Sequence, residues 1–545
     1  MDPTPMPAES TTVNEDPQRT LARWARRLRP TRRRVVRLVL FGTAALAAVV
    51  LVVVGVGAWF YTRAVESNVG DLSFTNELDV PPLLEPTADD DGRKVFELDF
   101  QAGETELLDG QLTETWGLND TYLGPTLRAE RGDRVEVRVT NGVSETTTLH
   151  WHGMHLPAEM DGGPHQMVEP GETWSPTWDI DQPAATLWYH PHLMGETADQ
   201  VYRGAAGMFI LDDDEARDTG LPDDYGIDDV PLIVQDKRFD SDGSLDQSTP
   251  FMSNVGVLGD EILINGTHDP YFEATTSLVR FRVLNASNAR VYNLGFADDR
   301  SYWQVGTDSG LLEQPHETTR LQLSPGERSE IVVDVEPGER AVLRSHSPDL
   351  GVNFPQERFN GGDDTFDLLE IRGAPDLADS GPLPETLVEI EAPTEDEAVG
   401  TRTFDFTNGH TINGREMDPG RIDQVVEVDT TEIWEITNDH GTPHSFHPHL
   451  IHFAVLDIDG EAPPPSLQGW KDTIYVPPGS TIRVIARFED YTDPDTPYMF
   501  HCHVLRHEDR GMMGQFVVVG PGEEPDPSAL ADAAGDRHDH SAHGS

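Results

Sequence analysis

The chain has 545 residues, which is too long for a single hydrophobic core and predicts three or four domains. Acidic residues number 97 against 39 basic ones, and this net charge of -58 excludes nucleic acid and anionic lipid as partners for most of the chain. So acidic a composition, with only three lysines, is typical of salt-accumulating halophiles, and we expect a haloarchaeal protein rather than a merely acidic one.

The first predicted element is a membrane anchor over residues 38–61, a run of 24 residues without a charge. Residues 1–37 carry nine arginines and four acids, so the positive-inside rule predicts a cytoplasmic N-terminal segment and an extracytoplasmic remainder. The stretch from Thr31 to Arg37 also resembles a twin-arginine export signal. No clear cleavage site follows the apolar run, so we expect an uncleaved single-pass anchor, with a cleaved signal as the alternative.

After a linker predicted over residues 62–90, the sequence repeats itself three times. Alternating strands that end in Asn141, Asn285 and Asn438 recur at intervals of 144 and 153 residues. Pro-Gly turns at 170–171, 325–326 and 478–479 follow the same period. We therefore predict an all-β chain of three tandem Greek-key β-sandwich domains, over 91–220, 228–375 and 385–522. Residues 523–545 are predicted to be a disordered acidic tail that contains histidines.

Histidines recur in pairs separated by one residue. Chance predicts about 0.8 His-x-His triplets in a chain of this composition, whereas five are present. Four of them lie in the first and third repeats, at 150–152, 190–192, 447–449 and 501–503, and the fifth lies in the tail. Because residues i and i+2 of a strand point to one face, each of the four triplets offers two imidazoles for a metal ion.

The only cysteine, Cys502, lies between His501 and His503 and must point to the opposite face of the strand. Its candidate companions are His444, His507 and Met512. Two imidazoles, one thiolate and a weak axial thioether are the ligands of a blue-copper site, whereas zinc would not need the methionine. Two metal centres would thus share one strand, joined by covalent bonds through Cys502.

The order and spacing of these motifs resemble those of the three-domain multicopper oxidases, over residues 91–520. The motifs are His150-Trp-His-Gly153, Trp188-Tyr-His-Pro-His192, His444-x-x-His-x-His449 and His501-Cys-His-x-x-x-His507 with Met512. The segments 124–127, 263–266, 308–312 and 469–473 look like the branch of copper-efflux oxidases, spore-coat laccases and bilirubin oxidases. The resemblance implies three cupredoxin domains that hold four copper ions.

It also implies a role for each ligand position. The type 1 copper would be held by His444, Cys502, His507 and Met512, and the type 2 copper by His150 and His447. The type 3 pair would be held by His152, His190, His192, His449, His501 and His503, not apportioned between its two ions.

Three carboxylates also fall on family positions. Glu508 and Asp161 match acids that supply protons to dioxygen, and Asp472 resembles an acid near the type 1 histidine where the substrate gives up its electron.

The resemblance implies a laccase-like oxidase that removes single electrons from phenols, aromatic amines or metal ions and reduces O2 to water. Alternatives are a cuprous oxidase, although 12 methionines include no methionine-rich insertion, a bilirubin oxidase, and a non-enzymatic copper-storage protein. A copper nitrite reductase is excluded because 190–192 contains no cysteine. The expected partners are O2, a small reducing substrate and a membrane, with a monomer favoured.

Overall fold

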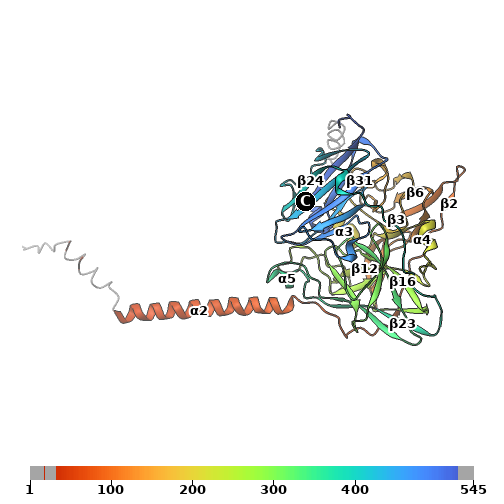
Figure 1. Ribbon diagram of the computed structural model, residues 1–545. Helices are drawn as coiled ribbons and strands as arrows, with labels where there is room; N and C mark the ends of the chain where they lie inside the picture. The colour runs from red at the N-terminus through yellow and green to blue at the C-terminus, as the bar shows by residue number, and fades with distance from the viewer. Residues whose placement is uncertain (1–17, 19–21, 23–31, 526–545) are drawn as a thin grey trace, which may run out of the picture. The chain divides into compact units, whose positions relative to one another are not determined.

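The computed structural model describes residues 18, 22 and 32–525, and the chain divides into two compact units at Arg63 and Ala64 (Figure 1). Almost all of the predicted histidine-containing tail lies outside the described residues, and so does most of the arginine-rich segment.

The first unit contains helix α2 (Arg32–Arg63), whose 32 residues exceed the predicted span at both ends. None of its side chains is buried, and its apolar residues surround the axis, as in a helix that meets lipid on all sides. At ~1.5 Å per residue the helix is longer than the ~30 Å hydrocarbon layer of a bilayer. By length and composition α2 is able to cross a membrane.

The regular secondary structure of the second unit consists mainly of strands, which form six sheets in the described residues. The strands of the first repeat are β2 (Thr87–Ala88), β3 (Lys94–Leu108), β4 (Gln111–Leu118), β5 (Leu127–Glu130), β6 (Arg134–Asn141), β7 (His150–His152), β8 (Thr173–Trp174), β9 (Thr177–Asp179), β10 (Ala185–His190) and β11 (Gly207–Asp212). They form one sheet with the order β5-β11-β10-β7 and another built on β2-β3-β6-β8.

The second repeat has a six-stranded sheet with the order β1-β15-β23-β22-β17-β20 and a seven-stranded sheet with the order β14-β13-β12-β16-β21-β18-β19. Its strands are β1 (Asn76–Glu77), β12 (Asp229–Lys237), β13 (Glu261–Ile264), β14 (Thr267–His268), β15 (Pro270–Thr276), β16 (Leu278–Asn285), β17 (Tyr292–Phe296), β18 (Tyr302–Thr307), β19 (Gly310–Thr318), β20 (Leu321–Leu323), β21 (Arg328–Asp334), β22 (Arg340–His346) and β23 (Phe366–Ala378).

The third repeat pairs a sheet β25-β24-β27-β31-β29 with a sheet β26-β33-β32-β28-β30. Its strands are β24 (Ala398–Asn408), β25 (Thr411–Ile412), β26 (Gln424–Glu427), β27 (Thr430–Asn438), β28 (His444–Pro448), β29 (Phe453–Ile458), β30 (Ile474–Val476), β31 (Thr481–Phe488), β32 (Asp493–Cys502) and β33 (Met513–Val519). The short helices of the second unit are α3 (Thr197–Tyr202), α4 (Asp214–Asp218), α5 (Gln356–Phe359), α6 (Leu505–Asp509), η1 (Ala158–Met160), η2 (Glu395–Glu397) and η3 (Pro465–Leu467).

The two sequence markers of the repeat contact each other in all three domains. The amides of Gly171, Gly326 and Gly479 donate to the carbonyls of Asn141, Asn285 and Asn438 at 2.7–3.0 Å. Each glycine has a φ between +79° and +87°, a conformation that a side chain disfavours. Each asparagine side chain also donates to two backbone carbonyls. The repeated sequence therefore encodes one repeated corner of the fold.

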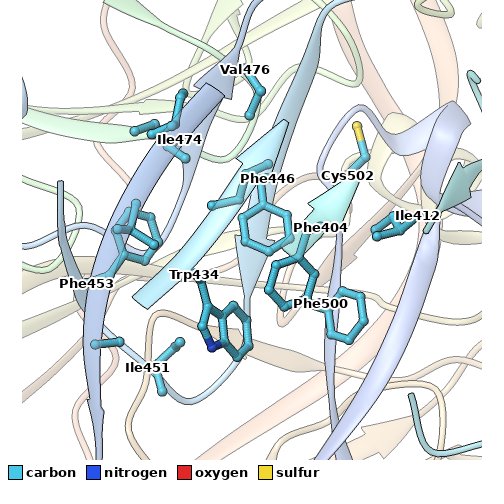
Figure 2. Packing of buried hydrophobic residues seen from close by; sticks show 14 of the residues in the cluster. Phe404, Ile412, Trp434, Phe446, Ile451, Phe453, Ile474, Val476, Phe500 and Cys502 are labelled. Carbon is cyan, nitrogen blue, oxygen red and sulfur yellow. The ribbon is translucent and has the colours of Figure 1, made fainter. Parts of the chain in front are cut away.

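Each repeat has its own hydrophobic core, made of residues from both of its sheets. In the third repeat, aromatic residues such as Phe404, Trp434 and Phe446 fill the space between the sheets, and Cys502 belongs to the same cluster (Figure 2). The all-β prediction is confirmed. The predicted ranges 91–220, 228–375 and 385–522 remain our proposal for the domain boundaries.

The segment 62–90, predicted as a linker, adds a strand to the second repeat. Strand β1 pairs in parallel with β15, and the amide of Phe74 donates to Asp269 at 2.6 Å. The amide of Glu66 donates to Asp364 at 2.9 Å. The linker prediction was incomplete, because pairing with a strand about 200 residues away leaves no local pattern.

Candidate metal centres

Two strand pairs bring the predicted histidines together. In the first repeat, β7 runs antiparallel to β10, which places His150 opposite His190. In the third repeat, β28 runs antiparallel to β32, which places His447 opposite His501 and Phe446 opposite Cys502. The period of two along each strand then separates the cysteine from its neighbouring histidines, as expected.

The first group of ligand atoms comprises His444, Cys502 and His507, which are all buried. The sulfur of Cys502 lies 3.4 Å from Nδ1 of His444 and 3.6 Å from Nδ1 of His507. Met512 is also fully buried, in the same core cluster as Cys502, and its carbonyl accepts from the Cys502 amide at 3.0 Å. Helix α6 turns the chain back so that His507 and Met512 return to the cysteine.

The eight paired histidines form a second, larger group in which every member is at most 1% exposed. Three sets of ligand atoms lie within 4.8 Å of one another, namely His150, His152 and His447; His152, His190 and His503; and His192, His449 and His501. The rings of His152 and His447 stack with their centroids 3.7 Å apart, and those of His150 and His449 at 3.8 Å. Residues of the first and third repeats thus converge on one site.

The hydrogen bonds of these rings fit a metal cluster. In His150, His190, His447 and His449, Nδ1 donates to a carbonyl or carboxylate oxygen at 2.7–2.9 Å. The Nε2 atom of each of these four rings is buried without a hydrogen-bond partner. Histidines that bind metals show this arrangement, in which one nitrogen is held by a second residue and the other offers its lone pair.

His192 and His501 give a second sign of a cation site. Their Nε2 atoms lie 3.1 Å apart, while their Nδ1 atoms face the Glu508 carboxylate at 3.4 Å and 3.1 Å. Because a carboxylate only accepts, the hydrogens belong on Nδ1 and the two Nε2 lone pairs face each other. A shared cation stabilises such a pair.

Burial favours the neutral imidazole, which is the form that binds metals, at eight of these positions: His152, His190, His192, His444, His447, His449, His503 and His507. Burial lowers the pKa of His192 and His503 to about 3 and that of His507 to about 4. Burial raises the pKa of the Cys502 thiol to about 12, so a bound cation is needed to displace its proton at neutral pH.

Comparison with known proteins agrees with this chemistry. Family models described as multicopper oxidase match residues 99–216 and 389–521. The multicopper oxidase Mco of Staphylococcus aureus is 35% identical over 456 residues, which cover 83% of this chain and 94% of that protein. The chain belongs to the multicopper oxidases.

Two further relatives show the range of the family. The cell division protein FtsP of Edwardsiella tarda is 36% identical over 449 residues, covering 81% of this chain and 92% of that protein. The structure of the laccase-like multicopper oxidase CueO of Ochrobactrum sp. superposes with a TM-score of 0.74, at 36% identity, covering 81% of this chain and all of that one. The groups of His and Cys ligand atoms in the present chain are consistent with type 1, type 2 and type 3 copper sites. The protein is therefore an O2-reducing oxidoreductase of this family.

All three predicted carboxylates contact histidines of the cluster in this oxidase, and Asp161 and Glu508 do so on opposite sides. Asp161 is 1% exposed, and its carboxylate accepts from Nδ1 of His449 at 2.7 Å while its carbonyl accepts from His150 at 2.9 Å. Glu508 faces His192 and His501 on the opposite side. Burial acts to raise the pKa of Glu508, but these two imidazoles outweigh it and hold the pKa at about 2, so the carboxylate is ionised at neutral pH.

The described side-chain contacts of Asp472 include the histidine cluster and residues of the second repeat. The side chain is fully buried and contacts His152 of the cluster, with 3.1 Å between its Oδ1 and Nε2 of that histidine. It also forms two bonds of 2.6 Å with Arg328. A carboxylate enclosed by these groups is not accessible to a substrate from outside, and a place for Asp472 near a type 1 histidine stays a prediction from the resemblance.

The sequence prediction missed two residues of the second repeat that reach the copper sites. Arg328 contacts Asp472, and the carbonyl of Asn254 accepts from Nε2 of His507 at 2.8 Å. Arg328 follows the Pro-Gly turn of the second repeat, which offered a weak signal. Nothing in the local sequence marks Asn254, because its contact with His507 joins positions 253 residues apart.

Proposed function

We propose that the four coppers are held by the twelve residues that the motifs indicate. Type 1 copper is assigned to His444, Cys502, His507 and Met512, and type 2 copper to His150 and His447. One type 3 ion is assigned to His152, His190 and His503, and the other to His192, His449 and His501. The convergence of these residues into four buried sets, with free ring nitrogens directed inward, supports this assignment.

We propose that electrons enter beside His507. His444 and His507 are at most 1% exposed, and the segment around Asn254 covers His507 through the hydrogen bond to Nε2. Phe251 and Met252 of that segment are 56% and 44% exposed and offer an apolar surface to an aromatic donor. From Cys502, covalent bonds lead directly to His501 and His503.

Bound copper would take single electrons from the donor and pass four of them to O2, a reaction that consumes four protons and yields two water molecules. Glu508 and Asp161 are the proposed groups that relay protons and orient histidines at this site. The Glu508 carboxylate is 1% exposed and faces His192 and His501, so a proton that it accepts transiently can pass to the cluster without crossing bulk water.

A laccase-like substrate range is our preferred proposal, covering phenols, aromatic amines and metal ions. The related Ochrobactrum oxidase is described as acting on lignin model compounds and lignosulfonate. A cuprous oxidase and a bilirubin oxidase are the alternatives within the family. The net charge of -58 disfavours bilirubin, which is an anion, by long-range repulsion.

Oxygen consumption by the purified, copper-loaded protein tests this proposal. The donors to compare are a phenol, an aromatic amine, Cu(I) and bilirubin, with the Cys502→Ser variant as the control for turnover through the type 1 site. We expect the phenol and the amine to be oxidised fastest. Faster turnover of Cu(I) would favour the cuprous oxidase. If none of the four donors is oxidised, the remaining candidate functions are copper storage and a role like that of FtsP.

We propose that α2 anchors the oxidase to the cell membrane, with the copper domains outside and export by the twin-arginine route. The charge of the arginine-rich segment and the length of α2 support this orientation. Protease added to intact cells is expected to degrade the oxidase domains, and protection of these domains would reverse the topology.

We also propose that the protein is halophilic, which rests on its net charge and its three lysines. A haloarchaeal source is part of this proposal.

A further inference from the structure

Two segments from different repeats interlock next to the histidine cluster. The segment of Asp308 and Ser309 belongs to the second repeat, and the segment of Lys471, Asp472 and Thr473 to the third. The amide of Ser309 donates to the carbonyl of Trp470 at 3.1 Å. Lys471 bridges Asp308 and Glu327, at 2.9 Å and 3.0 Å. Both segments are buried, although neither supplies a proposed copper ligand.

Arg328 is the centre of this contact, and all five of its N–H donors have an acceptor. Nε donates to the Thr186 carbonyl at 2.9 Å, and Nη1 and Nη2 donate to the carbonyls of Gly326 and Asp308 at 3.1 Å and 3.0 Å. The remaining two hydrogens bind the two carboxylate oxygens of Asp472 at 2.6 Å each. A guanidinium group held in this way has no freedom to rotate.

Asp472, which Arg328 holds in place, contacts two histidines of the cluster. Its Oδ1 atom lies 3.1 Å from Nε2 of His152, which also contacts Thr473 Oγ1 at 2.9 Å. The carbonyl of Asp472 accepts from Nδ1 of His447 at 2.8 Å. One residue therefore contacts histidines of both the first and the third repeat.

The contact with Asp472 also decides which nitrogen of His152 is available. A carboxylate only accepts, so Nε2 of His152 carries the hydrogen and Nδ1 carries the lone pair. Nδ1 of His152 is buried without a partner. The four histidines held through Nδ1, among them His150 and His447, expose Nε2 instead, so His152 is oriented in the opposite sense.

We propose that Arg328 and Asp472 form a clamp that fixes the orientation and tautomer of His152 and the position of His447. This inference rests on the proposed function, in which both histidines hold copper of the trinuclear cluster. The second domain, which supplies no ligand, thereby takes part in building the cluster. Arg328 is a positioning residue, since it acts through Asp472, and the bidentate geometry requires a guanidinium rather than an ammonium group.

The clamp predicts a selective effect of Arg328→Lys. Lysine keeps the charge but not the two parallel hydrogen bonds, so Asp472 gains freedom and His152 is no longer held in one orientation. We expect the trinuclear coppers to bind about 10–100-fold more weakly, the usual result of losing a residue that orients a metal ligand. The type 1 site should keep its copper and its blue colour, because none of its ligands contacts the clamp.

Arg290→Lys is the matched control. Arg290 is also buried and paired with two carboxylates of the second domain, Asp236 at 2.9 Å and Asp364 at 2.6 Å. Its described side-chain hydrogen bonds go to these carboxylates and to the Gly259 carbonyl, away from the histidines. This variant shares the loss of a buried guanidinium group paired with carboxylates, but it should leave the affinity for copper unchanged.

The experiment measures copper content, chelator titration and the electron paramagnetic resonance signal of type 2 copper in wild type and both variants. Selective loss from the trinuclear site in Arg328→Lys supports the clamp. A variant with wild-type affinity and signal would overturn it. If Arg328→Lys does not fold, Ser309→Ala removes only the 2.8 Å bond to Asp472 and should weaken trinuclear copper several-fold, and an unchanged affinity there would also overturn the clamp. A wild type without a type 2 signal would overturn the proposed function as well.

Discussion

Lys237 allows a quantitative test of the electrostatics, because this protein has only three lysines and two of them are buried. Lys237 is 1% exposed, and its Nζ atom donates to the Tyr202 carbonyl at 2.8 Å. No described salt bridge involves it. Lys471 is equally buried but contacts two carboxylates, Asp308 and Glu327. Burial lowers the pKa of Lys237 from 10.5 to about 7, whereas for Lys471 the two carboxylates outweigh burial and raise the pKa.

The sign and the size of the effect follow from proton binding. Between the folded pKa of about 7 and the unfolded value of 10.5, the unfolded chain binds a proton at Lys237 that the folded chain does not. The free energy of unfolding therefore rises with pH in this window, by up to ~1.4 kcal/mol per pH unit. The protein therefore loses stability through Lys237 as the pH falls toward 7. Between about pH 7 and about pH 9 the titration of Lys237 should change the free energy of unfolding by about 2–3 kcal/mol.

The perturbation is Lys237→Met, which keeps an unbranched apolar chain and removes the titrating group. Near pH 7 we expect the variant to be more stable than the wild type, by an amount that shrinks by about 2–3 kcal/mol as the pH rises to about 9. Lys471→Met is the control, because it leaves Asp308 and Glu327 buried without their partner. It should lose roughly 3–5 kcal/mol. Burial already raises the pKa of Asp308 to about 6, and loss of Lys471 raises it further, so any change with pH in this control should run in the opposite direction, toward lower stability at higher pH.

Urea unfolding of the copper-free proteins, at a fixed salt concentration and across this pH range, gives the required free energies. Histidines with pKa values of about 3 to 4, such as His192, His503 and His507, remain neutral throughout the range in the folded state. All other groups are shared by the wild type and the variant and cancel in the difference. A constant difference between wild type and Lys237→Met would refute the reasoning.

Other predictions concern the copper sites and salt. Cys502→Ser should lose the blue thiolate absorption and keep the other three coppers, and a blue variant would contradict the type 1 assignment. Asp161→Asn weakens the 2.7 Å bond to His449 and should lower trinuclear copper affinity about 10–100-fold in a chelator titration; unchanged affinity would argue against orientation by Asp161. Glu508→Gln should retain copper and colour but slow reoxidation by O2 about 100-fold or more, measured by stopped flow; reoxidation at the wild-type rate would exclude a proton role. Melting temperatures should rise between about 0.1 M and about 2 M salt because the Debye length falls from about 10 Å to less than 3 Å, and flat or falling values would contradict the halophilic proposal.

Much of the fold could be predicted from the sequence because its signals are local. Alternation along a strand, the Asn and Pro-Gly markers, and the His-x-His triplets can each be recognised within a few consecutive residues, and the markers then recur at intervals of 144 to 155 residues. A period of two is enough to show that Cys502 points away from His501 and His503. These signals gave the β-sandwich class and the two kinds of metal site, and family resemblance then indicated copper.

Only the tertiary structure decided which side chains from different repeats meet. Asp472 and His152 are 320 positions apart, and the same carboxylate that looked like a substrate contact is enclosed by Arg328, Ser309 and Thr473. Strand β1 likewise joins a sheet formed some 200 residues later. A buried charge is stable only where its partners are positioned, and those partners lie on other domains. Local sequence patterns carry no record of such contacts, because hydrogen bonds between distant segments depend on packing rather than on spacing along the chain.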